Sequence, residues 1–195
     1  MTCIVGLVEG KTVYIGADSL AVTGCVEQQL RSPKVFCCKG RDCLIGYSGT
    51  VRMANLLEHK FVPPGHPAEM GVEQYLTTFF VDGLRATLKE AGTAAKTNEQ
   101  EVSTGSLLVG YRGGLYKIGY DYGLMEAAAG FDAIGSGEEI ALGAIHATMG
   151  MKLQPLKRLR LALEAAADLC RGVRGPFVIE SLLKEGDNEH QQPPA

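Results

Sequence analysis

The sequence lacks the apolar run of about 18 residues that a membrane-spanning helix needs. It also lacks an excess of positive charge, because 19 Lys and Arg stand against 22 Asp and Glu, for a formal net charge of −3. This balance argues against nucleic-acid binding as the main function. The N-terminus lacks the basic start of a signal peptide, and Glu9 and Lys11 interrupt its apolar part. We therefore expect a cytoplasmic protein with neither a membrane nor a nucleic acid as partner.

Patterns typical of metal and nucleotide sites are missing as well. Cys37, Cys38 and Cys43 lie close together, but no second cluster with zinc-binding spacing follows them. In a reducing compartment, the six cysteines are expected to be thiols, mostly buried as small hydrophobic side chains. The glycines at 135 and 137 do not follow a β-α-β start, which argues against a nucleotide-binding loop. We predict neither a metal ion nor a cofactor.

The length of 195 residues suits one domain, and 46% hydrophobic content with 21% charged content is ordinary for a soluble globular protein. There is no internal repeat and no linker long enough to separate a second domain. We assign residues 1–184 to a single domain. The polar tail 185–195 contains proline near its end and is expected to be disordered.

Short apolar runs bounded by polar or glycine-containing breaks predict β-strands. They cover residues 2–8, 12–17, 33–38, 43–48, 106–111, 115–119, 124–127, 131–134 and 176–179. Helical spacing or capping signals predict helices over residues 50–61, 72–92, 136–149 and 156–171. Residues 19–31 and 93–104 are expected to be loops. Strands in hairpins with helices in pairs predict an α+β or layered αββα fold instead of a Rossmann alternation.

The first strand begins one residue after the start of the chain. Met1 precedes the small Thr2, a pair from which the initiator Met is normally removed, so Thr2 would carry both a free α-amine and a hydroxyl. An α-amine has a pKa of about 8 and can act as a general base near neutral pH. Threonine beside its own N-terminal amine is a recognised activated nucleophile. Cys3 is the weaker candidate, because Met1 and Thr2 would both have to be lost; alternatively, Thr2 merely opens a strand.

Two charged residues supply what such a nucleophile lacks. Asp18 ends the second strand and Lys34 starts the third. A cation beside the hydroxyl and the amine lowers their pKa values, and a carboxylate holds that cation in place. Taken singly, Asp18 fits a turn or cap residue, and Lys34 fits a solvated strand edge.

Two further residues are candidates for binding negative charge. Gly46 lies late in the fourth strand, where its N–H could donate to a developing oxyanion. Ser136 opens the third helix and, with Glu139 three residues later, forms a predicted capping box. The N-terminus of that helix would favour a negative charge nearby.

These motifs, taken in order, resemble the proteasome β-subunit family. The matching stretches are residues 2–6 (TCIVG), 15–18 (IGAD), 33–35 (PKV), 45–46 (IG), 134–137 (IGSG) and 168–172 (DLCRG). The resemblance covers nearly the whole chain, to about residue 183, and the ordered set is specific although no single motif is. Residues 133–149 and the short chain look nearer to HslV, the peptidase of a bacterial ATP-dependent protease.

The resemblance implies an N-terminal nucleophile (Ntn) hydrolase fold, a four-layer αββα sandwich with two antiparallel sheets between helix pairs. It implies Thr2 as nucleophile and general base and Lys34 with Asp18 as its electrostatic support. It further implies Gly46 N–H as oxyanion donor, with Ser136 and Asp168 completing the network around the amine.

The activity implied is that of a threonine peptidase that cleaves polypeptides inside a self-compartmentalising complex. Its partners would be copies of itself in a homo-oligomeric ring and, in addition, an ATPase (unfoldase) or a ring of α-type subunits. Two alternatives stay open: a catalytically silent, structural ring subunit, and an amidase of the same fold that acts on a small amide. An N-terminal extension is typical of the silent α-type subunits, whereas here a single Met precedes Thr2.

The sequence departs from the family pattern at a few positions. Arg171 stands where many proteasomal subunits have Ser, Leu20 replaces the usual Arg after the motif Asp, and Val22 replaces the common Thr. Arg171 follows Asp168 by three residues, so we expect both on one helix face and favour a salt bridge between them.

Overall fold

The structure is a computed structural model, which describes residues 1–38, 40, 43–97 and 100–184. The predicted tail, residues 185–195, lies outside this part of the chain. Within it, no helix is long and apolar enough to cross a membrane.

One sheet has four antiparallel strands in the order β12-β1-β2-β13. The strands are β1 (Ile4–Glu9), β2 (Thr12–Ala17), β12 (Phe131–Ile134) and β13 (Val178–Leu183). β1 and β2 form the predicted opening hairpin, in register from Ile4↔Ala17 to Glu9↔Thr12. Gly10 in its two-residue turn has a φ of 62°, a conformation that glycine adopts without steric cost.

The second sheet has five antiparallel strands in the order β11-β10-β9-β6-β5. Its strands are β5 (Val35–Cys37), β6 (Cys43–Gly49), β9 (Gly105–Tyr111), β10 (Gly114–Ile118) and β11 (Leu124–Glu126). β6 is an interior strand of this sheet, because β5 pairs with one of its edges and β9 pairs with the other.

The helices are α1 (Val51–His59), α2 (Val72–Tyr75), α3 (Val81–Glu90), α4 (Glu138–Thr148) and α5 (Pro155–Leu169). A π-helical turn, η1 (Leu76–Phe80), joins α2 to α3, so that the predicted helix over residues 72–92 is one element with an internal π-turn. The mixture of helices and antiparallel sheets that the sequence predicted is confirmed.

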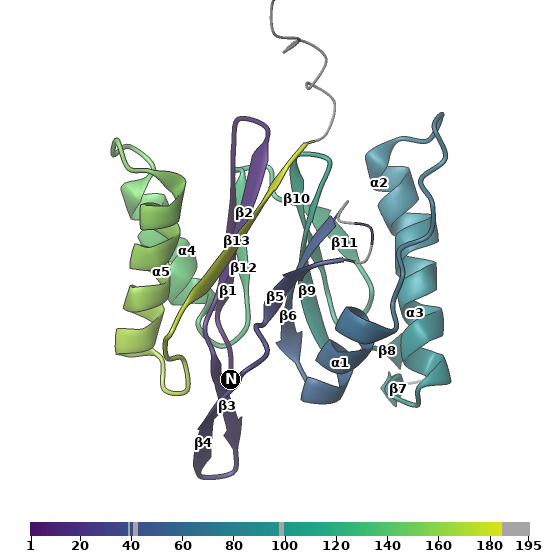
Figure 1. The fold of residues 1–195 in the computed structure, drawn as a ribbon, viewed down its shortest axis with the longest axis horizontal. Coiled ribbons are helices and arrows are strands. Elements are labelled where there is room, and N and C mark those ends of the chain that lie inside the picture. The colour runs from purple at the N-terminus through teal and green to yellow at the C-terminus, as the bar shows by residue number, and fades with distance from the viewer. Residues whose placement is uncertain (39, 41–42, 98–99, 185–195) are drawn as a thin grey trace, which may run out of the picture.

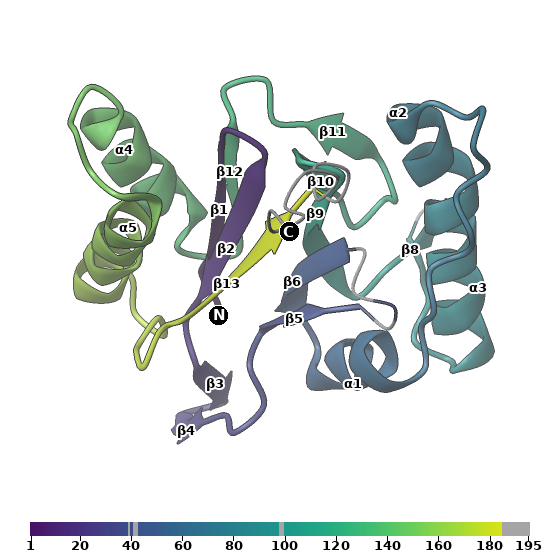
Figure 2. The same cartoon turned by 45° about the horizontal axis from the view of Figure 1, so that its top comes forward.

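The two sheets face each other, and helices lie on their outer sides. In Figure 1, α4 and α5 flank the sheet that contains β1 and β2, and α1 and α3 flank the sheet that contains β6 and β9. Figure 2 shows the same order with the top turned forward. Three buried apolar clusters fill the spaces: one between the sheets around Ile4, Ile15 and Leu108, and one beneath each set of helices.

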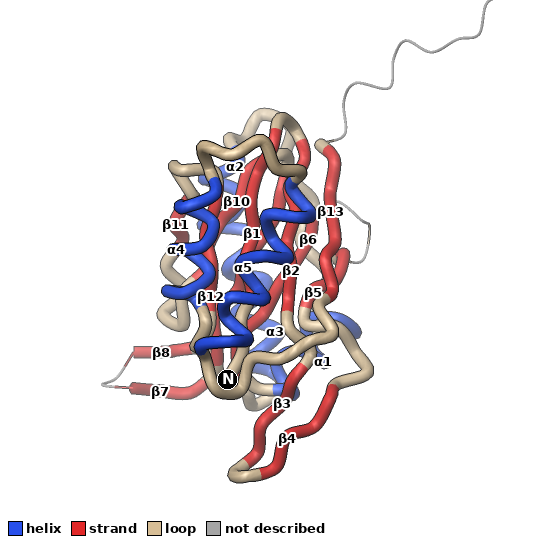
Figure 3. The backbone as a smooth tube through the Cα atoms, turned by 90° about the vertical axis from the view of Figure 1, so that its left-hand side faces the viewer, coloured by secondary structure: helices blue, strands red, loops and turns tan. Residues whose placement is uncertain are grey.

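Two stretches that were expected to be loops contain short hairpins. Residues 19–31 hold β3 (Leu20–Thr23) and β4 (Val26–Gln29), which project from the end of the molecule near the N-terminus (Figure 3). Residues 93–104 hold β7 (Ala95–Thr97) and β8 (Gln100–Val102). β4 and β8 were missed because they are largely polar and carry no apolar alternation, and β3 and β7 are only four and three residues long. β13 also runs further than residue 179, because it pairs with β2 along its whole length.

The expectation that all six cysteines are thiols is wrong at one pair. Cys38 and Cys43 form a disulfide across the end of the β5–β6 hairpin. Their Cα atoms are 5.4 Å apart, which suits a disulfide, and the N–H of Cys38 donates to the carbonyl of Cys43 at 2.8 Å. The hairpin register brings the two side chains together, a juxtaposition that sequence spacing does not reveal.

The spacing between the sheets predicts unequal effects of two Gly→Ala substitutions. A Cβ on Gly110 of β9 would lie 2.9 Å from Cγ1 of Val13, whereas one on Gly143 of α4 meets no atom within 4 Å. We expect Gly110→Ala to lower the free energy of unfolding by about 1–3 kcal/mol through overpacking. Gly143→Ala should raise it by about 0.5–1 kcal/mol, because it removes a helix-interior glycine. Urea denaturation measures both; a neutral Gly110→Ala would show that the sheets are not in this contact.

Candidate active site

Thr2 lies two residues before the start of β1, next to the N-terminus that is marked in Figure 1. It is 6% exposed. Its backbone N–H donates to the Ser136 hydroxyl at 3.1 Å. Its carbonyl accepts from the N–H of Gly137 at 3.2 Å and from the Ser136 hydroxyl at 3.3 Å. The loop between β12 and α4 therefore fixes the backbone of Thr2 at both of its polar groups.

The ammonium group of Lys34 connects the Thr2 hydroxyl to a buried carboxylate. Its Nζ lies 3.1 Å from Oγ1 of Thr2 and 2.9 and 3.0 Å from the two carboxylate oxygens of Asp18. It also donates to the carbonyl of Leu20 at 2.6 Å. Lys34 is 2% exposed and Asp18 is fully buried. The alternative of a solvated strand edge for Lys34 is thus wrong, and the lysine is a buried cation surrounded by oxygen atoms.

Backbone donors hold Asp18 in place at the end of β2. One carboxylate oxygen accepts from the N–H of Cys3 at 2.9 Å, and the other accepts from the N–H of Leu20 at 3.0 Å. The N–H of Asp18 in turn donates to the carbonyl of Cys3 at 3.2 Å. Because Cys3 directly follows Thr2, the same carboxylate positions both the nucleophile's segment and the lysine.

The electrostatics of this group favour a reactive hydroxyl. Burial lowers the pKa of Lys34, and the adjacent Asp18 carboxylate opposes this shift. With four oxygen atoms around it, the lysine is an ammonium ion that stabilises negative charge on Oγ1 of Thr2. Such an arrangement supports a nucleophilic threonine but supplies no base by itself, because Asp18 is already saturated with donors.

Met1 occupies the amine side of this site. The Thr2 hydroxyl donates to the Met1 carbonyl at 2.6 Å. The Met1 side chain lies against Gly172, where a Cβ would be 2.9 Å from Cβ of Met1. While Met1 is attached, the nitrogen of Thr2 belongs to an amide and cannot accept a proton. The amine therefore becomes a base only after the bond between Met1 and Thr2 is cleaved.

The predicted capping box at Ser136 is wrong. Gly137 is the N-cap residue of α4, and no side chain caps this helix end. The Ser136 hydroxyl is engaged with Thr2 across 134 positions of sequence instead. Local spacing favoured a cap, but the tertiary partner takes the hydroxyl.

Gly46 lies inside β6. A Cβ on Gly46 would lie 2.5 Å from Cγ2 of Ile4, so glycine is required for packing between the sheets. The N–H of Tyr47 donates to the carbonyl of Lys34 at 3.0 Å. Because N–H groups alternate along a strand, the Gly46 N–H points the other way, toward its register partner Leu108 in β9.

Gly49 is the last residue of β6 and was not among the predicted site residues. By the same alternation, its N–H points to the edge that Tyr47 shares with Lys34. β5 begins at Val35, so within the described chain no strand pairs with this end of β6 on the edge opposite β9. The sequence indicates only that Gly49 ends the strand. The direction in which its N–H points depends on the register of β6 with its neighbours.

Asp168 and Arg171 do not share a helix face. α5 ends at Leu169, and Cys170 is extended, with φ −111° and ψ 116°, so the i,i+3 geometry of a helix is lost. Both side chains are exposed. In residues 1–38, 40, 43–97 and 100–184, neither makes a hydrogen bond or an ion pair. The expected salt bridge between them is therefore absent, and the structure does not join Asp168 to Thr2.

Cys3 is fully buried, which disfavours it as the nucleophile. Burial, with a smaller effect of Asp18, raises the pKa of its thiol to about 12. No group of three or more His, Cys, Asp or Glu residues in the described chain is arranged to hold a metal ion. The site therefore consists of Thr2, Asp18, Lys34 and Ser136, brought together from four separate segments.

Comparison with models of known families found no match, and comparison with curated proteins found none either. Solved structures are similar to this chain. BPH of Thiobacillus denitrificans matches with a TM-score of 0.79 and 21% identity, covering 95% of this chain and 100% of that one. A structure of BPH in complex with epoxomicin gives 0.78 and 20%, with coverage of 95% and 100%.

Eukaryotic HslV of Trypanosoma brucei matches with a TM-score of 0.68 and 22% identity, over 93% of this chain and 99% of that one. Anbu, an ancestral β-subunit of Yersinia bercovieri, gives 0.65 and 12%, over 93% and 82%. At these identities the likeness establishes the fold. The predicted resemblance to proteasome-type Ntn hydrolases is confirmed at that level.

The burial of Cys3 predicts selective alkylation. At pH 8 in the native protein, iodoacetamide should modify the exposed Cys25 and leave Cys3 unmodified, because Cys3 is buried and its thiol has a pKa of about 12. The raised pKa stabilises the fold below pH 9.0, and this contribution is lost as the pH rises from 9.0 toward about 12. Peptide mass spectrometry identifies the modified residues. Modification of Cys3 at the rate of Cys25 would contradict its burial.

Proposed function

We propose that the protein is a threonine peptidase whose nucleophile is the Thr2 hydroxyl, with the Thr2 α-amine as general base once Met1 is removed. The observation that carries this proposal is the contact of Lys34 Nζ with both Oγ1 of Thr2 and the Asp18 carboxylate, in a site where all three residues are nearly buried. A buried cation held beside a hydroxyl has a clear chemical use, because it stabilises the alkoxide that attacks a carbonyl.

The reaction then proceeds in two halves. The Thr2 amine takes the proton from Oγ1 while Oγ1 bonds to the carbonyl carbon of the substrate. The tetrahedral intermediate collapses with cleavage of the C–N bond, and the proton passes from the Thr2 amine to the leaving amine. Water then attacks the resulting ester, its proton goes to the Thr2 amine, and cleavage of the C–O bond returns a proton to Oγ1.

The neighbouring residues have defined roles in this proposal. Lys34, held by Asp18, lowers the cost of charge on Oγ1, and the Ser136 hydroxyl holds the Thr2 nitrogen in place. We assign the oxyanion donor to the N–H of Gly49, and not to Gly46, because of the direction in which each N–H points. One such donor is typically worth about 3–4 kcal/mol of barrier. Asp168 has no direct role.

We further propose that the layers in Figure 1 are the αββα sandwich of the Ntn hydrolases, formed by a single domain of residues 1–184.

The proposed setting is a cytoplasmic, self-compartmentalising homo-oligomeric ring that degrades polypeptides. Its further partner would be an ATPase (unfoldase) or an α-type ring. Exposed apolar side chains at Met149, Met151, Leu156 and Leu169, on and near α4 and α5, support an interface there.

The proposed nucleophile predicts the mature N-terminus and the effect of two substitutions. Intact mass should show a chain that starts at Thr2, since a blocked amine cannot act as the base. Thr2→Ala should abolish peptide hydrolysis without unfolding the protein. Lys34→Ala should reduce peptide hydrolysis almost as much. The double variant should be little worse than either single one, because residues that act as one unit are non-additive.

The control for these variants is Arg160→Ala, an exposed cation away from the site, which should retain full activity. Active protein that keeps Met1, or a Lys34→Ala variant with most of its activity, would contradict the mechanism. A folded protein with a free Thr2 and no turnover of any peptide would favour the silent ring subunit. Turnover of small amides alone would favour the amidase.

The ring has its own test. A general peptidase must exclude folded proteins from its sites, and closed rings require heterologous interfaces with cyclic symmetry. Light scattering at micromolar concentration should therefore give a mass of several protomers. Substitution of Leu169 and Leu156 by Asp should reduce that mass, because both side chains are exposed and apolar on α5. A fully active monomer would remove the ring from the proposal.

A further inference from the structure

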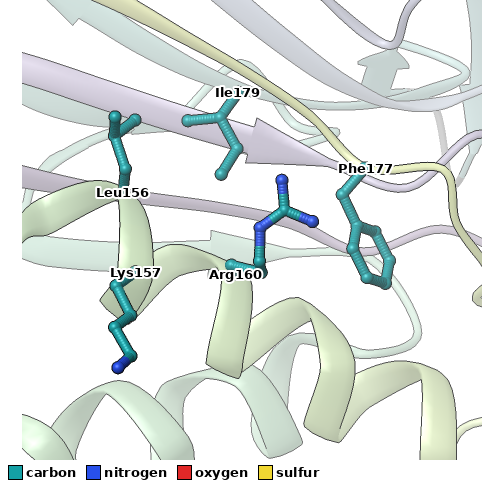
Figure 4. A pocket seen from close by; sticks show the side chains of 5 residues that line it. All are labelled: Leu156, Lys157, Arg160, Phe177 and Ile179. Atoms are coloured by element: carbon teal, nitrogen blue, oxygen red, sulfur yellow. The ribbon is translucent and has the colours of Figure 1, made fainter.

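Two surface pockets lie along α5, one near each end. The first has a volume of about 680 Å³ and is lined by Leu156, Lys157, Arg160, Phe177 and Ile179 (Figure 4). The second has a volume of about 570 Å³ and is lined by Glu27 of β4 and by residues 167–174 at and after the end of α5. Only the second of these two pockets has lining residues that contact the neighbours of Thr2.

The wall of the second pocket contacts Met1 and Ser136, the two residues next to the Thr2 nitrogen. Gly172 packs against Met1, which is bonded to that nitrogen. The Cys170 thiol donates to the carbonyl of Ser136 at 3.4 Å, and the Ser136 hydroxyl accepts from the Thr2 N–H. The segment that lines this pocket is therefore continuous with the candidate active site, whereas the pocket in Figure 4 lies along the first half of α5.

The direction of proton transfer decides which part of a substrate would enter this pocket. In the proposed mechanism, the Thr2 amine gives its proton to the leaving amine of the substrate. The leaving segment must then pass within hydrogen-bond reach of the Thr2 nitrogen. This is the side on which Met1 lies against Gly172, and its removal opens that space next to the pocket.

We propose that the pocket formed by Glu27 and residues 167–174 binds the substrate residues that follow the scissile bond, and that Arg171 makes it selective for acidic side chains there. This assignment rests on the proposed function. It concerns the choice of substrate and not the cleavage step.

The pocket contains two anions and two cations, and the position of Arg171 among them favours an acidic ligand. Glu27 and Arg174 neutralise each other in an ion pair of 2.9 Å. Asp168 and Arg171 are the other two charged groups, and in the described residues neither is paired. Arg171 lies between Cys170 and Gly172, the two residues that contact the site, whereas Asp168 is set back in the last turn of α5. Its guanidinium presents a fork of donors that matches a carboxylate.

A pair of peptides tests the assignment. The two are identical up to the scissile bond and carry either Glu or Lys at the second and third positions after it. Wild-type protein with a free Thr2 should cleave the Glu peptide about fivefold faster in kcat/KM, the upper range for one partly exposed ion pair. Arg171→Gln should bring the ratio near one, and Arg171→Glu should invert it. Mass spectrometry of the products gives both rates in one mixture.

Arg160→Glu is the matched control, because it reverses an exposed Arg of α5 that lines the pocket of Figure 4 and not the pocket of Arg171. It should leave the ratio at the wild-type value. Thermal denaturation of the Arg171 variants checks that they are folded. Equal rates in the wild type, a preference for Lys, or a ratio that Arg171→Gln does not change would overturn the assignment.

The same experiment separates this inference from the proposed function. Cleavage that depends on Thr2 but ignores the charge after the scissile bond would overturn the pocket assignment alone. Cleavage that persists in Thr2→Ala, or no cleavage at all by protein with a free Thr2, would overturn both.

Discussion

The buried ion pair between Lys34 and Asp18 is the interaction on which the site depends. Removing two such charges from water costs several kcal/mol for each ion, and the pair is stable only if the remaining polar atoms are satisfied. Here the ammonium meets Leu20 and Thr2 oxygens besides the carboxylate, and the carboxylate accepts two backbone N–H bonds. Each of these hydrogen bonds fixes the position of the group that makes it. Because the Thr2 hydroxyl is one of the groups that hydrogen-bond to the ion pair, the pair also orients this hydroxyl.

The ion pair between Lys34 and Asp18 links the two sheets. The geometry of the site therefore depends on how the sheets pack. Asp18 follows β2 of one sheet, and Lys34 precedes β5 of the other. The apolar cluster between the sheets, around Ile4 and Leu108, sets how closely these ends approach. Gly46 and Gly110 permit that approach because neither brings a side chain into the gap. A change deep in this cluster would thus reach Lys34 without touching the site.

The sequence predicted site residues where the chemistry of the residue type determines the role. It did not predict contacts that depend on strand register or on partners distant in the sequence. Strand hairpins and the group of Thr2, Asp18 and Lys34 could be predicted, because a nucleophile, a cation and a carboxylate have complementary needs. Gly46 was predicted as the oxyanion donor without regard to the direction of its N–H, which depends on the pairing of its strand. Ser136 and Arg171 were misjudged from helical spacing, since α4 and α5 do not include them.

The side chains around the Thr2 nitrogen are already in place while Met1 is attached. The Ser136 hydroxyl already holds the Thr2 nitrogen, and Lys34 already contacts Oγ1, before any amine exists. Cleavage after Met1 would therefore change the chemistry of one nitrogen without requiring the surrounding side chains to move. A nearby cation favours the neutral form of the new amine, which is the form that accepts a proton. The same lysine thus serves the hydroxyl and the base, and its burial keeps solvent from screening either effect.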